Sequence, residues 1–492
     1  MNAWRYYMPQ LLDSYTVSVN DIVVDINITQ DVDDPVPSYL INITSVTDTT
    51  KLILEKIRQE FISRLDSQSL QKAEETQGTS AIRRHFEEEI RKLIKQYFPE
   101  ADEHKQSMLV SYLVEENLGL GKLEILLKDP NLEEIVINNA NEPVWVYHRK
   151  HAWVKTNIKL VNEARIRHYA MQIGREVGKE ITSLAPLMDA HLHTGDRVNA
   201  TLSPISSKGN TMTIRKFADD PWTITKFLKE GTISFSAAAL IWLGIQNELS
   251  MLIAGGTGSG KTSMLNVLAN FFPPNQRIIS IEDTRELVLP KTLHWVPMET
   301  RLPNPEGKGE ITMLDLLVNS LRMRPDRILV GEIRRKKEAE VMLEAIHTGH
   351  SVYGTIHAND SEEVIMRLTN PPIDIPKPMI SSLGMVIVQN RNRRTGKRRT
   401  LQIAEVLTTG DPNVLLQLDM YNDMLFKVRE SESVMEKLRL YTGMSAQQLA
   451  EDLEYRIRVL KWLVANGKED VHEIGMIMSK FYRGTLNLEE GA

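Results

Sequence analysis

A glycine-rich segment in the second half of the chain could hold phosphate groups. Residues 255–262 fit the pattern G-x-x-x-x-G-K-S/T, directly after an apolar run and before a helical pattern. In such a loop, backbone N–H groups close around phosphate oxygens, and the following helix adds its dipole. We expect the Lys261 ammonium to reach the β- and γ-phosphates and the Thr262 hydroxyl to ligate Mg²⁺. The residues predicted to bind the nucleotide are Gly255, Gly256, Thr257, Gly258, Ser259, Gly260, Lys261, Thr262 and Ser263.

Carboxylates and imidazoles at the ends of other apolar runs could act on a bound phosphate. Glu282 and Asp283 end one predicted strand, and Glu332 follows another. Parallel α/β sheets carry their chemistry at the carboxyl ends of strands, where a carboxylate can hold the Mg²⁺ shell or orient the attacking water. His350 and His357 flank a third strand, and either imidazole could contact the γ-phosphate. Each residue alone could be structural, but their shared position after successive strands favours a hydrolytic site.

The elements that must position these residues form an α/β pattern. From about 130 to 215, short strands surround one helical pattern, and beyond 220 four apolar strands alternate with helices. The second alternation predicts a parallel sheet covered by helices. Earlier, residues 1–30 alternate like a strand pair, Asp48 begins a helix, two helices follow at about 81–97 and 104–118, and 67–80 is the first credible linker. The chain beyond 410 is mostly helical in pattern. The predicted segments are 1–80, 81–218, 219–410 and 411–492.

Composition excludes several classes of protein. A chain of 492 residues, 42% hydrophobic and 25% charged, is an ordinary folded protein of several domains. Its 59 Lys and Arg against 65 Asp and Glu give a net charge of -6, which disfavours nucleic-acid binding. The absence of cysteine excludes disulfides, cysteine-ligated zinc and thiol catalysis, and fits a reducing compartment. With no signal-peptide pattern and only short apolar stretches, we expect a soluble chain that meets a membrane through a partner.

Four motifs, in order, make the chain resemble the type II/type IV secretion superfamily of hexameric ATPases over roughly residues 130–410. They are the phosphate loop, an aspartate box at 281–286, a Walker B segment at 328–334 without the usual Asp, and a histidine box at 348–358. The resemblance implies a RecA-like parallel-sheet P-loop domain, preceded by a smaller mixed α/β domain and followed by a helical C-terminal segment. It also implies ATP and Mg²⁺ as cofactors. In that family pattern Glu282 polarises the water, Glu332 serves the γ-phosphate and, through water, Mg²⁺, and His350 with His357 completes the site.

The same family carries arginines in its N-terminal domain that reach a nucleotide held by another domain or subunit. By motif, the candidates are Arg197 in the run Gly-Asp-Arg-Val-Asn-Ala and Arg215 in the run Thr-Ile-Arg-Lys-Phe. An always-charged planar guanidinium suits a transferring phosphoryl group. Each could equally form a surface salt bridge, and the choice between action in cis and in trans stays open. Lower-ranked candidates are Arg301, Arg322 and Arg324.

Within the superfamily, the chain looks like archaeal members, the archaellum motor ATPase and the archaeal type IV pilus assembly ATPases. Residues 368–376 and 390–400 carry that likeness, and a four-cysteine zinc module is absent. The resemblance implies a homohexamer at the cytoplasmic face of the membrane that pushes on a polytopic membrane platform protein. A secretion-channel ATPase that transfers substrates is the closest alternative. A nucleic-acid translocase and a nucleotide-gated scaffold are the others.

A basic run near residue 395 predicts a hairpin. Apolar residues at 387–388 and 401–403 flank a turn at Thr395 and Gly396, so the charges would be solvated on one face. Contact with an acidic partner loop, anionic lipid or nucleic acid stays open, although the run lacks the aromatic residues that stack on single strands. Its members are Arg391, Arg393, Arg394, Lys397, Arg398 and Arg399.

Overall fold

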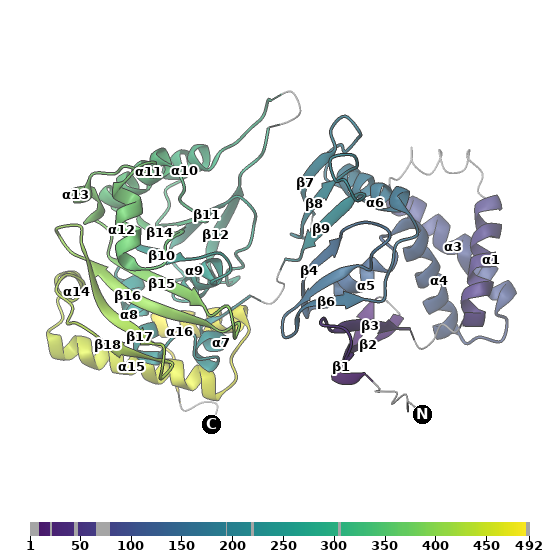
Figure 1. Ribbon diagram of the computed structural model, residues 1–492. Coiled ribbons are helices and arrows are strands. Elements are labelled where there is room, and N and C mark those ends of the chain that lie inside the picture. Colours follow the sequence, from purple (N-terminus) through teal and green to yellow (C-terminus); the bar gives the residue numbers. More distant parts are fainter. Residues whose placement is uncertain are drawn as a thin grey trace, which may run out of the picture. The chain divides into compact units, whose positions relative to one another are not determined.

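A computed structural model describes residues 9–19, 22–43, 48–64, 79–192, 194–217, 221–303 and 307–488. The chain forms two compact units, Met1–Asp219 and Asp220–Ala492, and the described residues of each build one nine-stranded sheet (Figure 1). The predicted linker at 67–80 lies almost entirely outside the described residues. Among the described helices, none is both long and apolar enough to cross a bilayer.

The sheet of the first unit is almost entirely antiparallel and has the order β1-β2-β3-β6-β5-β4-β9-β8-β7. The predicted strand pair is confirmed as β1 and β2, and both share this sheet with the later strands. The division of this unit into segments 1–80 and 81–218 stays a prediction. The strands are β1 (Gln10–Val19), β2 (Ile22–Gln30), β3 (Ser38–Asn42), β4 (Leu132–Ile137), β5 (Trp145–His148), β6 (Ala152–Thr156), β7 (Leu187–His191), β8 (Arg197–Thr201) and β9 (Thr211–Arg215).

Helices bury one face of this sheet. Alternating residues such as Val198 and Ile214 point into a single apolar core, whereas their neighbours stay at least partly exposed. A buried carboxylate ties the first strands to this core, because Asp129 accepts hydrogen bonds from the hydroxyls of Tyr15 at 2.7 Å and Tyr39 at 2.5 Å. All three predicted helices are present. The helices are α1 (Asp48–Arg64), α3 (Thr79–Tyr97), α4 (Glu103–Leu118), α5 (Leu123–Lys128) and α6 (Glu163–Glu176).

The sheet of the second unit is parallel on one side and antiparallel on the other. Its order is β12-β11-β13-β14-β10-β15-β16-β17-β18, parallel from β12 to β15 and antiparallel from β15 to β18. The four predicted strands are β10, β11, β13 and β14, whereas β17 and β18 extend the sheet into a segment expected to be mostly helical. The strands are β10 (Met251–Gly255), β11 (Arg277–Glu282), β12 (His294–Glu299), β13 (Arg327–Val330), β14 (Ser351–Ile356), β15 (Met385–Arg391), β16 (Arg398–Val406), β17 (Pro412–Asp419) and β18 (Met424–Lys427).

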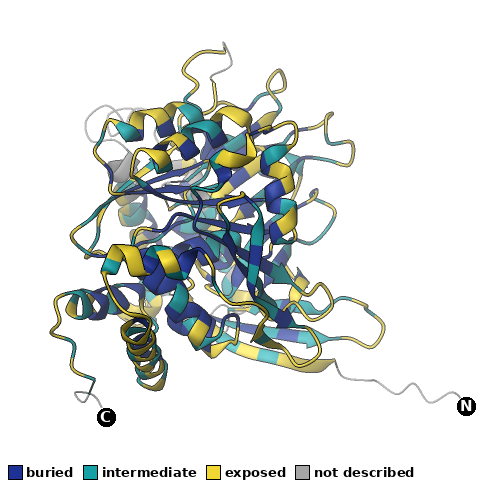
Figure 2. Ribbon diagram, turned by 90° about the vertical axis from the view of Figure 1, so that its left-hand side faces the viewer, coloured by how far each residue is buried: buried dark blue, intermediate teal, exposed yellow. Residues whose placement is uncertain are grey.

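Helices cover both faces of this second sheet, so its central strands are buried apolar runs (Figure 2). Met251 and Ile253 belong to the core beneath α8, α9 and α15, and Leu252 and Ala254 to the core beneath α10, α11 and α12. The predicted fold class is confirmed: a mixed α/β unit precedes a parallel-sheet α/β unit with a helical end. The helices are α7 (Ile224–Lys229), α8 (Phe235–Gln246), α9 (Lys261–Ala269), α10 (Met313–Leu321), α11 (Lys336–His347), α12 (Ser361–Thr369), α13 (Lys377–Ile380), α14 (Val434–Thr442), α15 (Ala446–Ala465) and α16 (Val471–Tyr482).

Candidate active site

The glycine-rich loop connects the buried strand β10 to the first turn of α9, as its pattern predicts. Gly258 and Gly260 have φ angles of 71° and 95°, a left-handed conformation that favours glycine. At Gly255, a Cβ atom would lie 2.3 Å from the Ser259 Oγ and 2.5 Å from the Gln389 carbonyl oxygen, so only glycine fits. The Ser259 Oγ is buried and has no hydrogen-bond partner in the described part of the chain. The loop is therefore a tight backbone cradle at a helix N-terminus, which suits a phosphate group.

The lysine of the loop is held in place by the loop itself. The Lys261 Nζ donates hydrogen bonds to the carbonyls of Gly255 at 3.0 Å and Gly256 at 3.1 Å, and lies 3.5 Å from the His357 Nδ1. Burial lowers the pKa of Lys261. A phosphate in the cradle would give this ammonium a charged acceptor in place of neutral carbonyls. The donor set and the cradle thus fit a nucleotide phosphate.

A chain of charged side chains continues from Lys261 along the carboxyl edge of the sheet. The Glu332 Oε1 lies 3.1 Å from the His357 Nε2, and the Glu332 Oε2 accepts from Arg334 at 2.6 Å. Arg334 also pairs with Asp283 at 2.8 Å. Burial, together with the charge of Lys261, lowers the pKa of His357, whereas the hydrogen bond to Glu332 raises the pKa of Arg334. The lowered pKa favours the neutral imidazole, which bridges a lysine and a carboxylate.

Glu282 is the last residue of β11 and is almost fully buried, with 3% of its surface exposed. Its Oε1 accepts the backbone N–H groups of Glu286 at 2.9 Å and Leu287 at 3.1 Å. Its Oε2 is buried with no partner among the described residues. Burial raises the pKa of this carboxyl to about 7. A carboxyl that titrates near neutral pH can take a proton from water.

Glu282 also lies next to the Glu332 segment. A Cβ atom at Gly331 would be 3.3 Å from the Glu282 Cα and 3.6 Å from its Cγ. The structure thus brings His357 and Glu332 to Lys261 and places Glu282 beside the Glu332 segment, because all three follow parallel strands of one sheet.

His350 lies elsewhere. Its Nδ1 is 3.2 Å from the Ala345 carbonyl oxygen and 3.2 Å from the Thr348 Oγ1, at the amino end of β14. The strand β14 separates it from His357, and seven steps at a rise of about 3.3 Å per residue place the two about 23 Å apart. Within one chain, the structure brings only His357 to the loop, and a role for His350 stays a prediction.

The two candidate arginines lie in the first unit. Arg197 on β8 and Arg215 on β9 are directly opposite in the strand pairing and are exposed. Arg197 forms a two-bond ion pair with Asp189, at 2.9 and 2.5 Å. Arg215 faces Glu134 on β4; burial raises the pKa of Glu134, and Arg215 opposes this effect. Their predicted contact with a nucleotide stays a prediction.

Sequence reasoning missed two arginines that flank the phosphate loop. The predicted hairpin is confirmed as β15 and β16, but it is not simply solvated. The Arg398 Nε donates to the Gly258 carbonyl at 3.1 Å, and the Arg391 Nη1 lies 3.3 Å from where a Cβ of Gly258 would be. Since β15 adjoins β10 in the sheet, the hairpin begins beside the loop. Only the strand order, which the sequence does not reveal, could have placed these residues.

The geometry defines an α/β protein with a phosphate-binding type of loop and a line of charged side chains at the carboxyl edge of its parallel strands. Residues 116–416 match the family model described as "Type II/IV secretion system protein". The chain is 37% identical over 353 residues to the uncharacterized protein MJ0781 of Methanocaldococcus jannaschii, covering 69% of this chain and 46% of that protein. It is 34% identical over 389 residues to the uncharacterized protein MJ0900 of the same organism, covering 76% and 70%. The chain therefore belongs to the type II/IV secretion system protein family, and it spans about half the length of MJ0781.

Among solved structures, the chain is similar to the pilus retraction motor PilT with bound ADP. The two are 17% identical, with a TM-score of 0.42, over 71% of this chain and 93% of PilT.

Proposed function

We propose that the chain binds and hydrolyses ATP at the loop 255–262 and works as the motor of a type IV pilus-like filament or a related secretion machine. The observation that carries this proposal is the line of side chains from Lys261 through His357 and Glu332 to Arg334, with the buried Glu282 beside it. Membership of the type II/IV secretion system protein family supports the same reading.

In the proposed site, the loop backbone and Lys261 hold the β- and γ-phosphates, and Arg398 neutralises charge from the other side of Gly258. The Thr262 hydroxyl would hold Mg²⁺ directly and Glu332 would hold it through water. When bound, that ion offsets the negative charge of the phosphates. The loop fits a nucleotide phosphate because it has an unused hydrogen-bonding group: the buried Ser259 Oγ has no partner in the described chain.

Glu282 is the proposed general base. With a pKa of about 7 it is partly ionised at neutral pH, and its unpaired Oε2 is the atom that would accept a proton from the attacking water. His357 lies between Lys261 and Glu332, so these two side chains do not pair directly. The Lys261 ammonium therefore stays available to the phosphates, whereas Glu332 is held by its ion pair with Arg334.

We further infer a homohexamer in which Arg197 or Arg215 supplies positive charge to a nucleotide held by another unit or subunit. The ring would act at the cytoplasmic face of the membrane, through a polytopic platform protein. Assembly or rotation of an archaellum-like or pilus-like filament is the favoured output, because residues 368–376 and 390–400 resemble the archaeal motor and pilus assembly ATPases. Transfer of substrates to a secretion channel is the second candidate, favoured by the description of the family.

Glutamine variants test the proposed chemistry. Glu282→Gln and Glu332→Gln should keep Mg·ATP affinity within about threefold, measured by titration calorimetry, while steady-state turnover falls about 10²- to 10⁴-fold. Glu436→Gln, an exposed change on α14, is the matched control and should leave both unchanged. Turnover that survives both active-site changes would refute the assignment of the acids. Turnover stimulated by nucleic acid would instead point to a translocase.

A further inference from the structure

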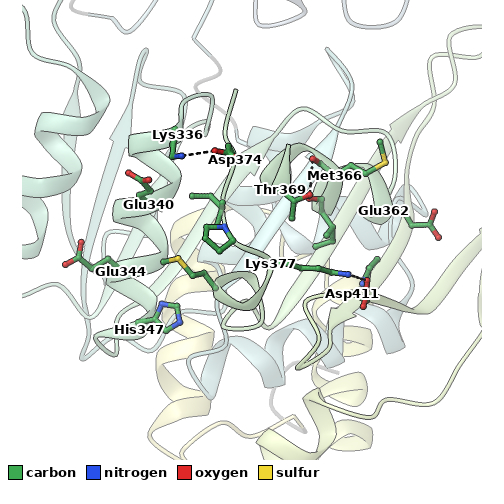
Figure 3. A pocket seen from close by; sticks show the side chains of 15 residues that line it. Lys336, Glu340, Glu344, His347, Glu362, Met366, Thr369, Asp374, Lys377 and Asp411 are labelled. Atoms are coloured by element: carbon green, nitrogen blue, oxygen red, sulfur yellow. Dashed lines mark hydrogen bonds and ion pairs between the residues drawn. The ribbon is translucent and has the colours of Figure 1, made fainter. Parts of the chain in front are cut away.

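The second unit has a surface hollow that takes no part in the site described above. The hollow measures about 1250 Å³ and lies between α11, α12 and the segment 374–379 (Figure 3). Apolar side chains form much of its lining, and Met366 is 58% exposed there. The apolar lining residues are Ile365, Met366, Ile375, Pro376, Met379 and Pro412. An apolar floor of this kind, within a polar rim, is the usual anatomy of a protein-binding surface.

The rim of this hollow carries surplus negative charge. Lys336 pairs with Asp374 at 3.0 Å and Lys377 pairs with Asp411 at 2.5 Å, so these four charges balance (Figure 3).

Three further carboxylates border the hollow: Glu340 and Glu344 one turn apart on α11, and Glu362 on α12. None of the three forms an ion pair with any residue that the structure describes. The hollow therefore repels anions and attracts a basic, partly apolar segment.

The same unit carries a basic segment that matches it. Arg393 and Arg394, at the tip of the β15–β16 hairpin, are exposed and form no ion pair within the described chain. Backbone hydrogen bonds join Asn392 to Lys397 and Gly396, so the tip is a formed turn.

The base of the hairpin is anchored on both sides. Arg399 makes two hydrogen bonds of 2.8 Å to Asp423, and Arg398 holds the Gly258 carbonyl. The tip thus presents two cations whose long aliphatic stems can cover an apolar floor.

The hairpin tip and the hollow lie toward different ends of β16. The tip precedes Arg398, whereas Asp411 and Pro412 of the hollow follow Val406. Nine residues of extended strand place these ends roughly 26 Å apart. The tip would thus meet the hollow of another copy more readily than its own.

We propose that the hairpin tip of one copy, through Arg393 and Arg394, docks in the hollow between α11 and α12 of a second copy. Because the two surfaces differ, the contact is head-to-tail and repeats from copy to copy, as in a ring. Since Arg398 joins the hairpin to Gly258, the contact links the phosphate loop of one copy to the surface of the next. The inference adds an interface to the proposed homohexamer. It rests on the proposed function only in assuming that the copies close into a ring.

Charge reversal tests this contact in the full chain, by sedimentation velocity over a range of protein concentrations. We expect the wild-type chain to assemble, and to assemble more weakly in 0.5 M salt. Two charge reversals should each raise the protein concentration at which half of the chains are assembled at least tenfold. They are the tip variant Arg393→Glu/Arg394→Glu and the hollow variant Glu340→Lys/Glu344→Lys. Combining the two should restore this concentration to within about threefold of wild type.

The matched control is Arg439→Glu/Lys461→Glu, which reverses two exposed charges on α14 and α15 and should not affect assembly. Circular dichroism checks folding, and Glu362→Lys replaces the hollow variant if α11 unfolds.

The proposal is overturned if wild type stays monomeric, if both reversals assemble like wild type, or if the combined variant stays dispersed. Because the readout is assembly, an intact interface without ATP turnover would contradict the proposed function alone.

Discussion

Replacing Glu282 by glutamine should stabilise the second unit at alkaline pH while it removes activity. The carboxyl is buried with an unpaired Oε2, and burial raises its pKa from the ordinary value of 4.5 to about 7. The folded state therefore stabilises the protonated carboxyl relative to the ionised carboxylate. Glutamine has nearly the same shape but cannot ionise, so it removes the cost of burying a charge.

The magnitude follows from the difference between the two pKa values. At about 1.4 kcal/mol per pKa unit, the carboxyl stabilises the fold by about 3 kcal/mol when protonated. Because the folded-state pKa is the higher one, this contribution is complete below pH 4.5 and is lost as the pH rises through 7. Between pH 5 and pH 8 the wild-type chain should lose about 2.5 kcal/mol that the Glu282→Gln variant keeps.

Denaturant unfolding at the two pH values measures this difference, with hydrogen exchange of the β11 amides reporting on the second unit. Comparing the variant with wild type at each pH cancels the contribution of every other titrating group. Subtracting the results at the two pH values also cancels the cost of burying the new amide. A difference below about 0.5 kcal/mol between the two pH values would show that Glu282 is ionised in the folded protein. That result would refute its assignment as a base that titrates near neutral pH.

Glu405 provides a control of opposite sign. Burial alone would raise its pKa, but hydrogen bonds from the backbone of Val434 and Glu432 and from the side chains of Asn413 and Ser431 outweigh it and lower the pKa. Its stabilising contribution is present above its ordinary pKa and lost as the pH falls. Glu405→Gln should therefore destabilise the second unit more at pH 8 than at pH 4, measured in the same way.

Three further outcomes are expected. Arg398→Ala should raise the KM for ATP about two- to tenfold in steady-state assays, because the phosphate loop loses a cation on Gly258, whereas Lys461→Ala on α15 should not change it. Tyr39→Phe should lower the free energy of unfolding of the first unit by about 1–3 kcal/mol, since it removes a buried donor to Asp129, and Tyr15→Phe should cost less because Tyr15 is partly exposed. His357→Phe should lower ATP turnover at least tenfold with little change in stability, because it breaks the bridge between Lys261 and Glu332.

Much of the candidate site could be predicted from the sequence, because its parts lie close together in the sequence or at the ends of parallel strands. A buried apolar strand, a glycine loop and a helix are contiguous, and the side chains that end parallel strands share one edge of a sheet. The placement of Glu282, Glu332 and His357 at the same sheet edge as Lys261 can therefore be predicted without knowledge of the strand order. The histidine-box motif groups His350 with them, but His350 precedes β14 rather than following it, and the two ends of a strand are far apart.

The parts that could not be predicted depend on contacts between residues distant in the sequence. Arg398 meets Gly258 because β15 pairs with β10, a pairing that no local pattern encodes. Asp129 meets Tyr15 and Tyr39 across 114 and 90 residues. The strands β12 and β18 lack fully buried residues, so they show little of the apolar alternation by which a strand is recognised.

The central claim is that the loop 255–262 hydrolyses ATP within an assembly. Steady-state ATP hydrolysis per chain, measured as protein concentration is raised with Lys261→Ala as the blank, tests it most directly. We predict that specific activity climbs steeply and then levels off, because the site is completed between copies. Activity no greater than that of the Lys261→Ala blank at every concentration would contradict the claim.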